Sequence, residues 1–318
     1  RLDRAEPMAD PTRVHEGGTP MRTLRLSLAG TVILALLAGL GGAMLAQAEE
    51  DITWPQPTGP TTYGDDRIQT LDGFEPEPRA EPRPAAILFH GGGLVFGHPY
   101  QDAEWAKWLA EQGYVTFMAG YRLFDPDTGE HPWPAQLDDA RRAMRWVRAH
   151  ADEFNVDPER VCAIGHSAGG QLASLLGTTE GPADPDPDLA GIPSRADCVV
   201  DISGSSDRMV PDPVPDPEWT ALMNELYGGS VEEAPEVWQA ASAAHNVDEA
   251  TVPFLIIHGN LDEMVSIEQS RNLAAALGEA GREFVYAEVP ADHFDVLELE
   301  ATSSLQAAFL ADQLHPEE

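Results

Sequence analysis

Short apolar runs alternate along this chain with longer segments in which apolar residues recur at the spacing of one helix face. The runs cover residues 85–90, 114–119, 160–165, 196–203, 253–259 and 283–290, and the helical segments cover 102–112, 134–154, 167–177, 267–281 and 294–314. Uninterrupted apolar runs suit strands that are buried on both faces. The alternation therefore predicts an α/β fold, with a mostly parallel central sheet and helices on both of its faces.

Two stretches break this alternation. Residues 51–84 are rich in proline and turn-forming residues, which suits an extended N-terminal arm with one or two edge strands around residues 61–70. Residues 204–251 are also proline-rich and include VPDPVPDPEWTALMNELYGG. We expect this second stretch to form a small insertion of loops and short helices over the edge at which the strands end.

The first 48 residues have the pattern of an upstream extension followed by an export signal. Residues 1–20 are polar, and Met21 opens a segment in which two arginines precede a long uncharged apolar stretch that ends in Ala-Gln-Ala at 46–48. Signal peptides end in such small residues. We therefore expect an extension over 1–20, a signal peptide over 21–48 and a single folded domain over 49–318, exported to the periplasm or the cell exterior. An uncleaved membrane anchor is the alternative, because the apolar stretch is long enough to span a bilayer.

Acidic side chains far outnumber basic ones in this sequence. The 318 residues include 54 aspartates and glutamates but 19 lysines and arginines, a formal net charge of −35. Such a surface repels phosphate groups, so neither nucleic acid nor an anionic membrane is expected as a partner. Solubility through self-repulsion is the simplest explanation of the charge, and adaptation to a salty habitat is the alternative.

The two cysteines, Cys162 and Cys198, both lie in apolar runs that read as strands. Export would permit a disulfide between them. Bridges between neighbouring strands usually strain the geometry of a disulfide, so we expect two buried free thiols. No set of cysteines and histidines has the spacing of zinc ligands, and neither a metal nor a cofactor is expected.

Ser167 lies at the centre of RVCAIGHSAGGQLASLLG, between a strand-like run and a helical segment. An abrupt turn from strand to helix requires small residues two positions before and after the turn, and Gly165 and Gly169 occupy these positions. In this context the pattern Gly-x-Ser-x-Gly is typical of a nucleophile elbow, which exposes a serine hydroxyl at the edge where the strands end. The N–H groups that open the following helix point at developing negative charge.

A serine hydroxyl at neutral pH needs a base, and the base needs a carboxylate that fixes its tautomer. His293 follows the last expected strand, where a loop would carry it over the same edge as Ser167. Asp262 follows the preceding strand by a few residues and is the expected carboxylate. The chain order Ser, Asp, His is that of the α/β-hydrolases.

A glycine-rich loop, FHGGGLVFG at residues 89–97, follows the first buried run. Glycines let the backbone approach a substrate closely, and backbone N–H groups aimed at an oxyanion are a large source of catalysis in acyl transfer. Beside a nucleophile elbow, the loop predicts an oxyanion hole.

Together these motifs resemble those of the acetyl esterase and hormone-sensitive lipase-like α/β-hydrolases, close to bacterial feruloyl-esterase-like exported esterases. The resemblance covers roughly residues 60–312 and rests on HGGG at 90–93, WPAQLDDARRAMRWV at 133–147, VDPERVCAIGHSAGG at 156–170, HGNLDEMV at 258–265 and DHF at 292–294. It implies that Ser167 is the nucleophile, that His293 is first the general base and then the acid, and that Asp262 orients His293.

The resemblance also assigns the loop around the substrate. It implies an oxyanion hole made by the N–H groups of Gly92, Gly93 and Ala168, and a loop shaped by His90 and Gly91. Three aromatic residues are candidates for lining the pocket, although core packing is an equally good reading for each: Phe96, Tyr121 and Trp133.

The expected reaction is hydrolysis of a small neutral ester through an acyl-enzyme, with short-acyl, acetylated-sugar and hydroxycinnamoyl esters as the substrates that the resemblance implies. An amide or peptide hydrolase uses the same machinery and is one alternative. A non-catalytic binding module on a hydrolase scaffold and a membrane-anchored interaction protein with an acidic face are the others. The sequence does not indicate an oligomeric state.

Overall fold

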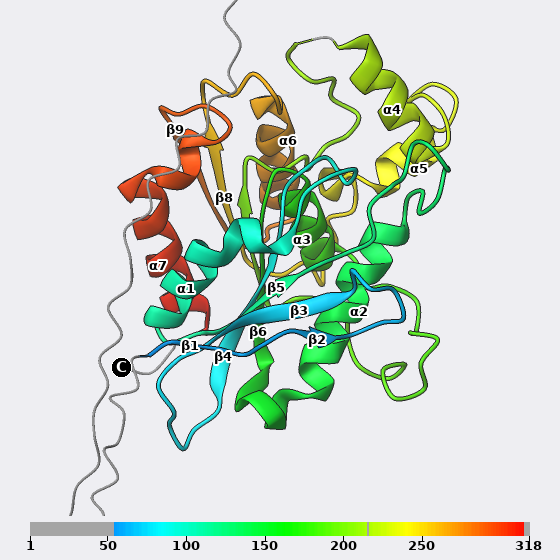
Figure 1. The fold of residues 1–318 in the computed structure, drawn as a ribbon. Helices are drawn as coiled ribbons and strands as arrows, with labels where there is room; N and C mark the ends of the chain where they lie inside the picture. The colour runs from blue at the N-terminus through cyan, green and yellow to red at the C-terminus, as the bar shows by residue number, and fades with distance from the viewer. Residues whose placement is uncertain (1–53, 215, 315–318) are drawn as a thin grey trace, which may run out of the picture. The chain divides into compact units, whose positions relative to one another are not determined.

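The computed structural model describes residues 54–214 and 216–314 (Figure 1). The expected extension over 1–20 and signal peptide over 21–48 lie outside these residues. The chain divides into two units, residues 1–50 and 51–318, and every described element belongs to the second unit.

The described strands form a single, mostly parallel sheet. They are β1 (Gln56–Pro57), β2 (Thr61–Thr62), β3 (Thr70–Glu75), β4 (Arg83–Phe89), β5 (Val115–Ala119), β6 (Val156–His166), β7 (Cys198–Ile202), β8 (Phe254–Gly259) and β9 (Phe284–Val289). Their order is β1-β3-β5-β4-β6-β7-β8-β9, with β2 paired to β3. The arm strands β1 to β3 pair antiparallel, and the pairs from β5 to β9 are parallel. The predicted α/β-hydrolase sheet is confirmed, including its N-terminal edge strands.

Helices cover both faces of the sheet, as the alternation predicts (Figure 1). They are α1 (Ala103–Glu111), α2 (Ala135–Ala149), α3 (Ala168–Thr178), α4 (Pro217–Tyr227), α5 (Pro235–Ala240), α6 (Ile267–Glu279) and α7 (Glu300–Leu314). Successive residues of β4 alternate between two buried clusters. Ile87 belongs to the cluster that contains residues of α2, α3 and α6, and Leu88 to the cluster that contains residues of α1 and α7. A strand with both faces buried explains the continuous apolar run.

The closing helix begins later than the sequence predicts. Residues Asp295–Glu298 form a 3-10 turn, Leu299 is extended, and α7 starts at Glu300. Asp292 Oδ1 accepts the backbone N–H groups of Phe294 (2.9 Å) and Asp295 (2.8 Å). These bonds hold the segment after His293 in a turn. His293 therefore precedes the closing helix in a loop and is not part of that helix.

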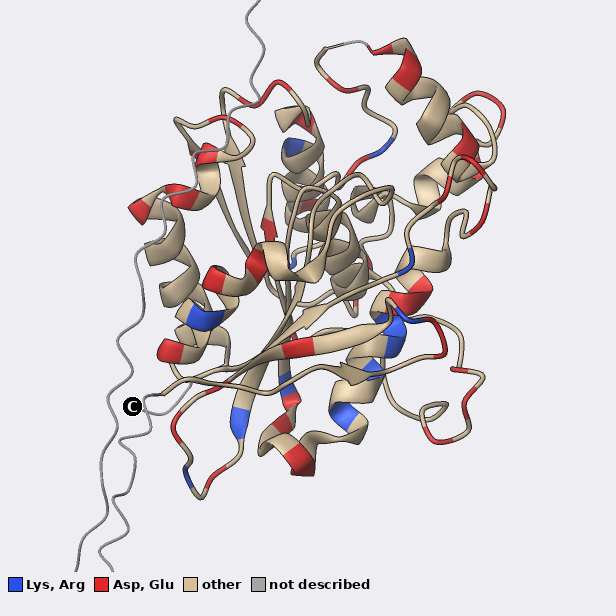
Figure 2. Cartoon of the chain, in the orientation of Figure 1, with Lys and Arg blue, Asp and Glu red and all other residues tan. Residues whose placement is uncertain are grey.

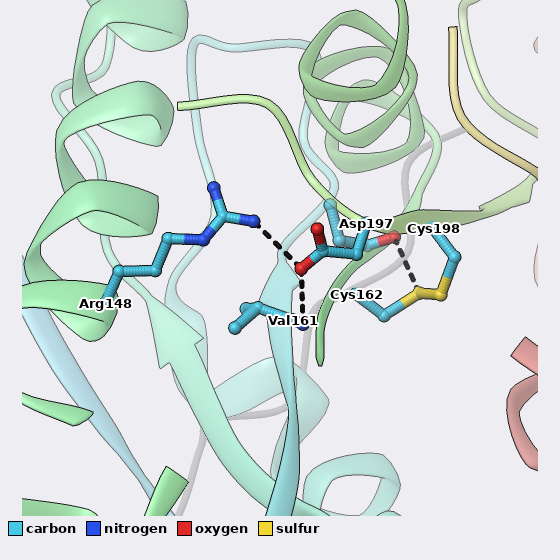
Figure 3. Close-up of a disulfide and its surroundings, with 6 residues drawn as sticks. Arg148, Val161, Cys162, Asp197 and Cys198 are labelled. Atoms are coloured by element: carbon cyan, nitrogen blue, oxygen red, sulfur yellow. Dashed lines mark hydrogen bonds and ion pairs between the residues drawn. A yellow bond between two sulfur atoms is a disulfide. The ribbon is translucent and has the colours of Figure 1, made fainter. Parts of the chain in front are cut away.

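Cys162 and Cys198 are joined by a disulfide between β6 and β7, which corrects the expectation of two free thiols (Figure 3). The two cysteines are register partners on adjacent parallel strands, and their Cα atoms lie 4.7 Å apart. That separation is within the range that disulfides span. Register partners point their side chains to the same face of the sheet, and the sequence did not reveal the register.

Acidic residues are spread over the loops and helix ends of the described chain, and basic residues are sparse (Figure 2). Among the described helices, none combines the length and apolar character that a bilayer crossing requires.

Candidate active site

Ser167 lies at the sharp turn between β6 and α3. Its backbone has φ 58° and ψ −122°, a left-handed conformation that non-glycine residues rarely adopt. A Cβ atom on Gly169 would lie 1.7 Å from the carbonyl oxygen of Phe89, so only glycine lets α3 approach β4 this closely. The strained serine between close-packed elements is the geometry expected of a nucleophile elbow.

His293 and Asp262 meet on the same edge of the sheet. His293 Nδ1 donates a hydrogen bond to Asp262 Oδ2 at 2.6 Å, and both side chains are buried. The other carboxylate oxygen, Oδ1, accepts the N–H groups of Met264 and Val265, each at 2.8 Å. Because Nδ1 donates to the carboxylate, Nε2 of His293 is left as the proton acceptor of the ring.

A second histidine shares the same carboxylate. His258 Nε2, at the end of β8, lies 3.3 Å from Asp262 Oδ2 and 3.1 Å from the Val265 carbonyl oxygen. Ser270 Oγ lies 2.7 Å from His258 Nδ1 and is placed to donate to it, which leaves Nε2 as the donor. Burial acts to raise the pKa of Asp262, but the hydrogen bonds from His258 and His293 outweigh it and hold this pKa well below its ordinary value.

His166, the residue before Ser167, ties the elbow to the histidine loop. Its Nε2 lies 2.7 Å from the backbone carbonyl oxygen of His293, and the two rings are 4.5 Å apart. Burial, together with the neighbouring His293, lowers the pKa of His166 to about 4. A neutral His166 at neutral pH donates this hydrogen bond and fixes the backbone of residue 293.

Free backbone donors lie beside Ser167. Gly92 and Gly93 have φ of 119° and 61°, and the carbonyl oxygen of Gly92 accepts the N–H groups of Val95 and Phe96. The N–H groups of Gly92, Gly93 and Ala168 have no hydrogen-bond acceptor among the described residues. The three residues line one cavity together with Ser167 and His293.

This Ser167 cavity has a volume of about 280 Å³. The insertion supplies one wall through Trp219, Met223 and Tyr227, which places it over the edge at which the strands end, as predicted. No hydrogen bond joins the Ser167 hydroxyl to His293 within residues 54–214 and 216–314. The arrangement thus brings a serine, a histidine–carboxylate pair and free N–H donors to one cavity.

The remaining candidate residues divide between the cavity wall and the support behind it. Gly91 and Phe96 line the cavity. His90 and Tyr121 are buried behind the loop with their rings stacked 4.2 Å apart, and the Tyr121 hydroxyl donates to the His90 carbonyl oxygen at 2.7 Å. Trp133 packs beside Tyr227 in the core. Gly91 and Phe96 thus belong to the cavity wall, and the other three residues support the loop and the wall.

Sequence reasoning did not single out His258, although it stands four residues before Asp262 in HGNLD. It also gave no role to Asp102 and Arg208, two buried ionisable residues that line the Ser167 cavity. Among the described residues, no three histidine, cysteine or acidic side chains are grouped as metal ligands.

A family model named BD-FAE matches residues 71–277 of this chain. The chain belongs to the BD-FAE family. The matched segment of this BD-FAE protein runs from β3 through α6 and includes Ser167 and Asp262.

Curated relatives of this BD-FAE protein are esterases. Esterase LipC of Mycobacterium tuberculosis is 33% identical over 245 residues, which cover 74% of this chain and 59% of LipC. Esterase LipQ of the same organism is 30% identical, with 71% of this chain and 54% of LipQ covered. This chain thus spans a little over half the length of each of these two relatives.

Solved structures with the same α/β-hydrolase fold cover most of this BD-FAE protein. A truncated carbohydrate esterase from gut microbiota has a TM-score of 0.71 and 25% identity, with 83% of this chain and 98% of that chain covered. Esterase 2 of the planctomycete Thermogutta terrifontis has a TM-score of 0.67 and 27% identity, with 80% and 91% covered. The latter esterase is also known in a form phosphonylated by sarin.

Proposed function

We propose that this protein is a serine carboxylic-ester hydrolase that acts on small neutral esters. One observation carries the proposal: Ser167, the His293 that is bonded to Asp262, and three N–H groups that have no acceptor among the described residues line one cavity. Membership of a family whose curated relatives are esterases supports the same conclusion.

The first half-reaction forms an acyl-enzyme. Ser167 Oγ attacks the ester carbonyl carbon while His293 Nε2 takes the hydroxyl proton, after a rotation of the serine side chain toward the ring. The carbonyl oxygen gains negative charge and accepts hydrogen bonds from the N–H groups of Gly92, Gly93 and Ala168. Protonated His293 then gives its proton to the leaving alcohol as the bond between carbon and that oxygen breaks.

The second half-reaction reverses these roles with water. Neutral His293 removes a proton from water, the hydroxide adds to the acyl carbon, and the same N–H groups bind the oxyanion. Collapse of the intermediate releases the carboxylic acid and returns the proton to Ser167 Oγ. Asp262 stays ionised throughout and stabilises the imidazolium in both steps.

The decisive assay is a series of p-nitrophenyl esters from acetate to palmitate, with methyl ferulate and acetylated xylan beside it. The 280 Å³ cavity predicts that kcat/KM is highest for the shortest acyl chains and declines toward palmitate. Ser167→Ala is the matched control and is expected to abolish turnover. A faster rate on a p-nitroanilide than on the corresponding ester would instead identify an amide hydrolase. If no ester or anilide is turned over and Ser167 is not labelled by a fluorophosphonate, the protein is a non-catalytic binding module.

We further propose that the mature protein acts outside the cytoplasm. The export pattern over residues 21–48 and the Cys162–Cys198 disulfide support this location, because disulfides persist in oxidising compartments. N-terminal sequencing of the native protein tests the proposal. A start near residue 49 is expected, and retention in membranes with the Met21 segment intact would instead establish an anchor.

A further inference from the structure

A second cavity lies between α1 and α7, next to the Ser167 cavity. Figure 1 shows the two helices side by side, and Trp105 Nε1 of α1 donates a hydrogen bond to Gln306 Oε1 of α7 at 2.8 Å. This α1–α7 cavity has a volume of about 330 Å³. Asp102 and Leu297 line both cavities, so the two spaces meet at these side chains. The proposed ester hydrolysis uses only the Ser167 side of this junction.

Asp102 places an unpaired carboxyl group at the junction. Its exposed fraction is 8%, and neither carboxyl oxygen accepts a hydrogen bond from any residue within 54–214 or 216–314. Asp102 stands directly before α1, but its side chain makes no cap hydrogen bond to that helix. Burial of a carboxyl group without a partner is costly, because no donor replaces the water that the group loses. The structure therefore leaves room for a donor or a cation beside Asp102.

Two indole rings form the wall of the α1–α7 cavity beyond Asp102. Trp105 and Trp108 are partly buried, and both pack against the core cluster that contains residues of α1 and α7. The hydrogen bond to Gln306 occupies the one N–H group of the Trp105 ring and fixes this ring against α7. The face of an indole ring carries negative potential and attracts cations more strongly than the faces of other aromatic side chains. This wall therefore favours a ligand that has both positive charge and apolar surface.

The charged side chains around the α1–α7 cavity have one sign. Glu104 and Glu298 line it together with Asp102, and no lysine, arginine or histidine of the described residues does so. Arg208 lines the Ser167 cavity only, and the Asp212 carboxylate 3.7 Å away balances its charge. These acidic groups repel an anion. They attract a cation, as does the net charge of −35 of the whole sequence.

An organic ammonium ion fits these features better than a hydroxyl group or a metal ion does. A hydroxyl group could donate to Asp102, but it gains nothing from the other two carboxylates. A metal ion needs several ligands in a fixed geometry, and no three histidine, cysteine or acidic side chains of the described residues are grouped in that way. An ammonium ion needs a counter-charge and aromatic surface, and both are present.

We propose that the α1–α7 cavity binds an organic ammonium ion, with Asp102 as its counter-ion and Trp105 and Trp108 against its apolar surface. Because Asp102 also lines the Ser167 cavity, the ion can be part of the ester that reacts there. This second step rests on the proposed ester hydrolysis and extends its substrates from neutral esters to esters that carry an ammonium group.

Calorimetry with choline tests the site separately from catalysis. The titration is run at pH 8, where Asp102 is mostly ionised, because burial raises its pKa to about 7. Choline is expected to bind with a Kd of about 1 mM or lower. Its uncharged analogue 3,3-dimethyl-1-butanol, in which carbon replaces the nitrogen, is expected to bind at least about tenfold more weakly. Asp102→Asn and Trp108→Leu are each expected to weaken choline binding by about three- to tenfold.

Glu111→Gln is the matched control, because Glu111 is an exposed acidic residue at the end of α1 that lines neither cavity. Its choline affinity is expected to equal that of the unmodified protein, and thermal unfolding checks that every variant folds. Equal binding of choline and its analogue, or equal losses in Glu111→Gln and Asp102→Asn, would overturn the proposed site. Trp108→Leu leaves the charge of the protein unchanged, so unaltered choline binding in this variant would overturn it as well.

The substrate step is tested with acetylcholine and 3,3-dimethylbutyl acetate, which have the same shape and differ in charge. The ratio of kcat/KM for acetylcholine to that for the analogue is expected to be at least about tenfold, and to fall about three- to tenfold in Asp102→Asn. A ratio near one in an enzyme that binds choline would overturn the substrate step and leave a site for free cations. A protein that binds choline but hydrolyses neither acetate nor p-nitrophenyl acetate refutes the proposed function and leaves the cation site standing.

Discussion

The carboxyl group of Asp102 is buried beside the Ser167 cavity, and its Oδ2 has no hydrogen-bond partner among the described residues. Burial raises the pKa of Asp102 from 3.8 to about 7. Between about pH 4 and 7 the folded protein keeps this proton while the unfolded chain loses it, so the free energy of unfolding falls as pH rises. The full effect is on the order of 4 kcal/mol.

Asp102→Asn removes this titration. The free energy of unfolding of the variant minus that of the unmodified protein is expected to be more positive at pH 7.5 than at pH 4.5. Urea unfolding at the two pH values measures the difference, and the unmodified protein at each pH is the control for every other titrating group. If the free energies of unfolding of the two proteins change equally between pH 4.5 and pH 7.5, Asp102 is ionised in the folded state at both pH values.

His258 is a positioning residue, because it acts on His293 through the carboxylate of Asp262. His258→Leu removes one donor from that carboxylate, and the resulting shift of the His293 ring is expected to lower kcat/KM by about 10- to 100-fold. The carboxylate of Asp262 then becomes more basic, so the hydrogen-bonded His293–Asp262 pair takes up a proton more readily and activity on the acidic side is expected to fall at a higher pH than in the unmodified enzyme.

The measurement is a pH profile of kcat/KM for His258→Leu, with His258→Asn as the conservative variant that keeps a donor. Partial recovery of the profile in His258→Asn is expected. A loss of stability with an unchanged pH profile would reduce His258 to a packing role.

Among the individual site residues, the sequence was enough to identify those that belong to short sequence motifs. Ser167 lies between Gly165 and Gly169, and the chain order of Asp262 and His293 was enough to predict one shared edge of the sheet. The sequence did not reveal His258, because its role depends on the carboxylate of Asp262, which only the fold brings near.

The glycine-rich loop after β4 is the element whose backbone shape bears most directly on the proposed chemistry. Gly93 has a left-handed φ of 61°, and a methyl group there would collide with Trp219. Gly93→Ala therefore displaces the loop or the insertion wall. Removal of one oxyanion donor typically costs about 100- to 1,000-fold in kcat, and a loss approaching this range is expected.

Gly129→Ala is the matched control, because Gly129 also has a positive φ of 73° but no atom within 4 Å of the added methyl group. Its kcat is expected to stay unchanged while its stability falls slightly. Equal activity in Gly93→Ala and Gly129→Ala, measured with p-nitrophenyl acetate, would remove Gly93 from the oxyanion hole.

The sequence predicted which segments form strands and which form helices. It predicted the ends of these elements and the pairing of the strands less well. The apolar runs identified β4 to β9, and all of these except the edge strand β9 are buried over most of their length, which leaves few polar residues. The start of α7 was misplaced because the Asp292 side chain bonds the backbone of residues 294 and 295, a local competition that helical periodicity does not register. The disulfide was missed because it depends on the register of β6 against β7.

The net charge of −35 is a property of the whole sequence, and Figure 2 shows acidic residues spread over the described part of the chain. Repulsion among acidic groups destabilises the compact state, and salt shortens its range from about 10 Å at 0.1 M to about 3 Å at 1 M. The urea midpoint is therefore expected to rise between 0.05 M and 1 M NaCl. Tetramethylammonium chloride should raise it equally if screening is the cause, and a midpoint that falls or stays flat with salt would contradict the expectation.

The central claim concerns the assembled site: Ser167 and His293, from distant parts of the chain, act together at one edge of the sheet. Reaction with a fluorophosphonate, followed by peptide mapping, tests it directly, because the probe requires an activated serine. A single adduct on Ser167 is predicted, with a labelling rate that falls by about 1,000-fold or more in His293→Ala. An adduct on another residue, or an unchanged rate in His293→Ala, would contradict the account.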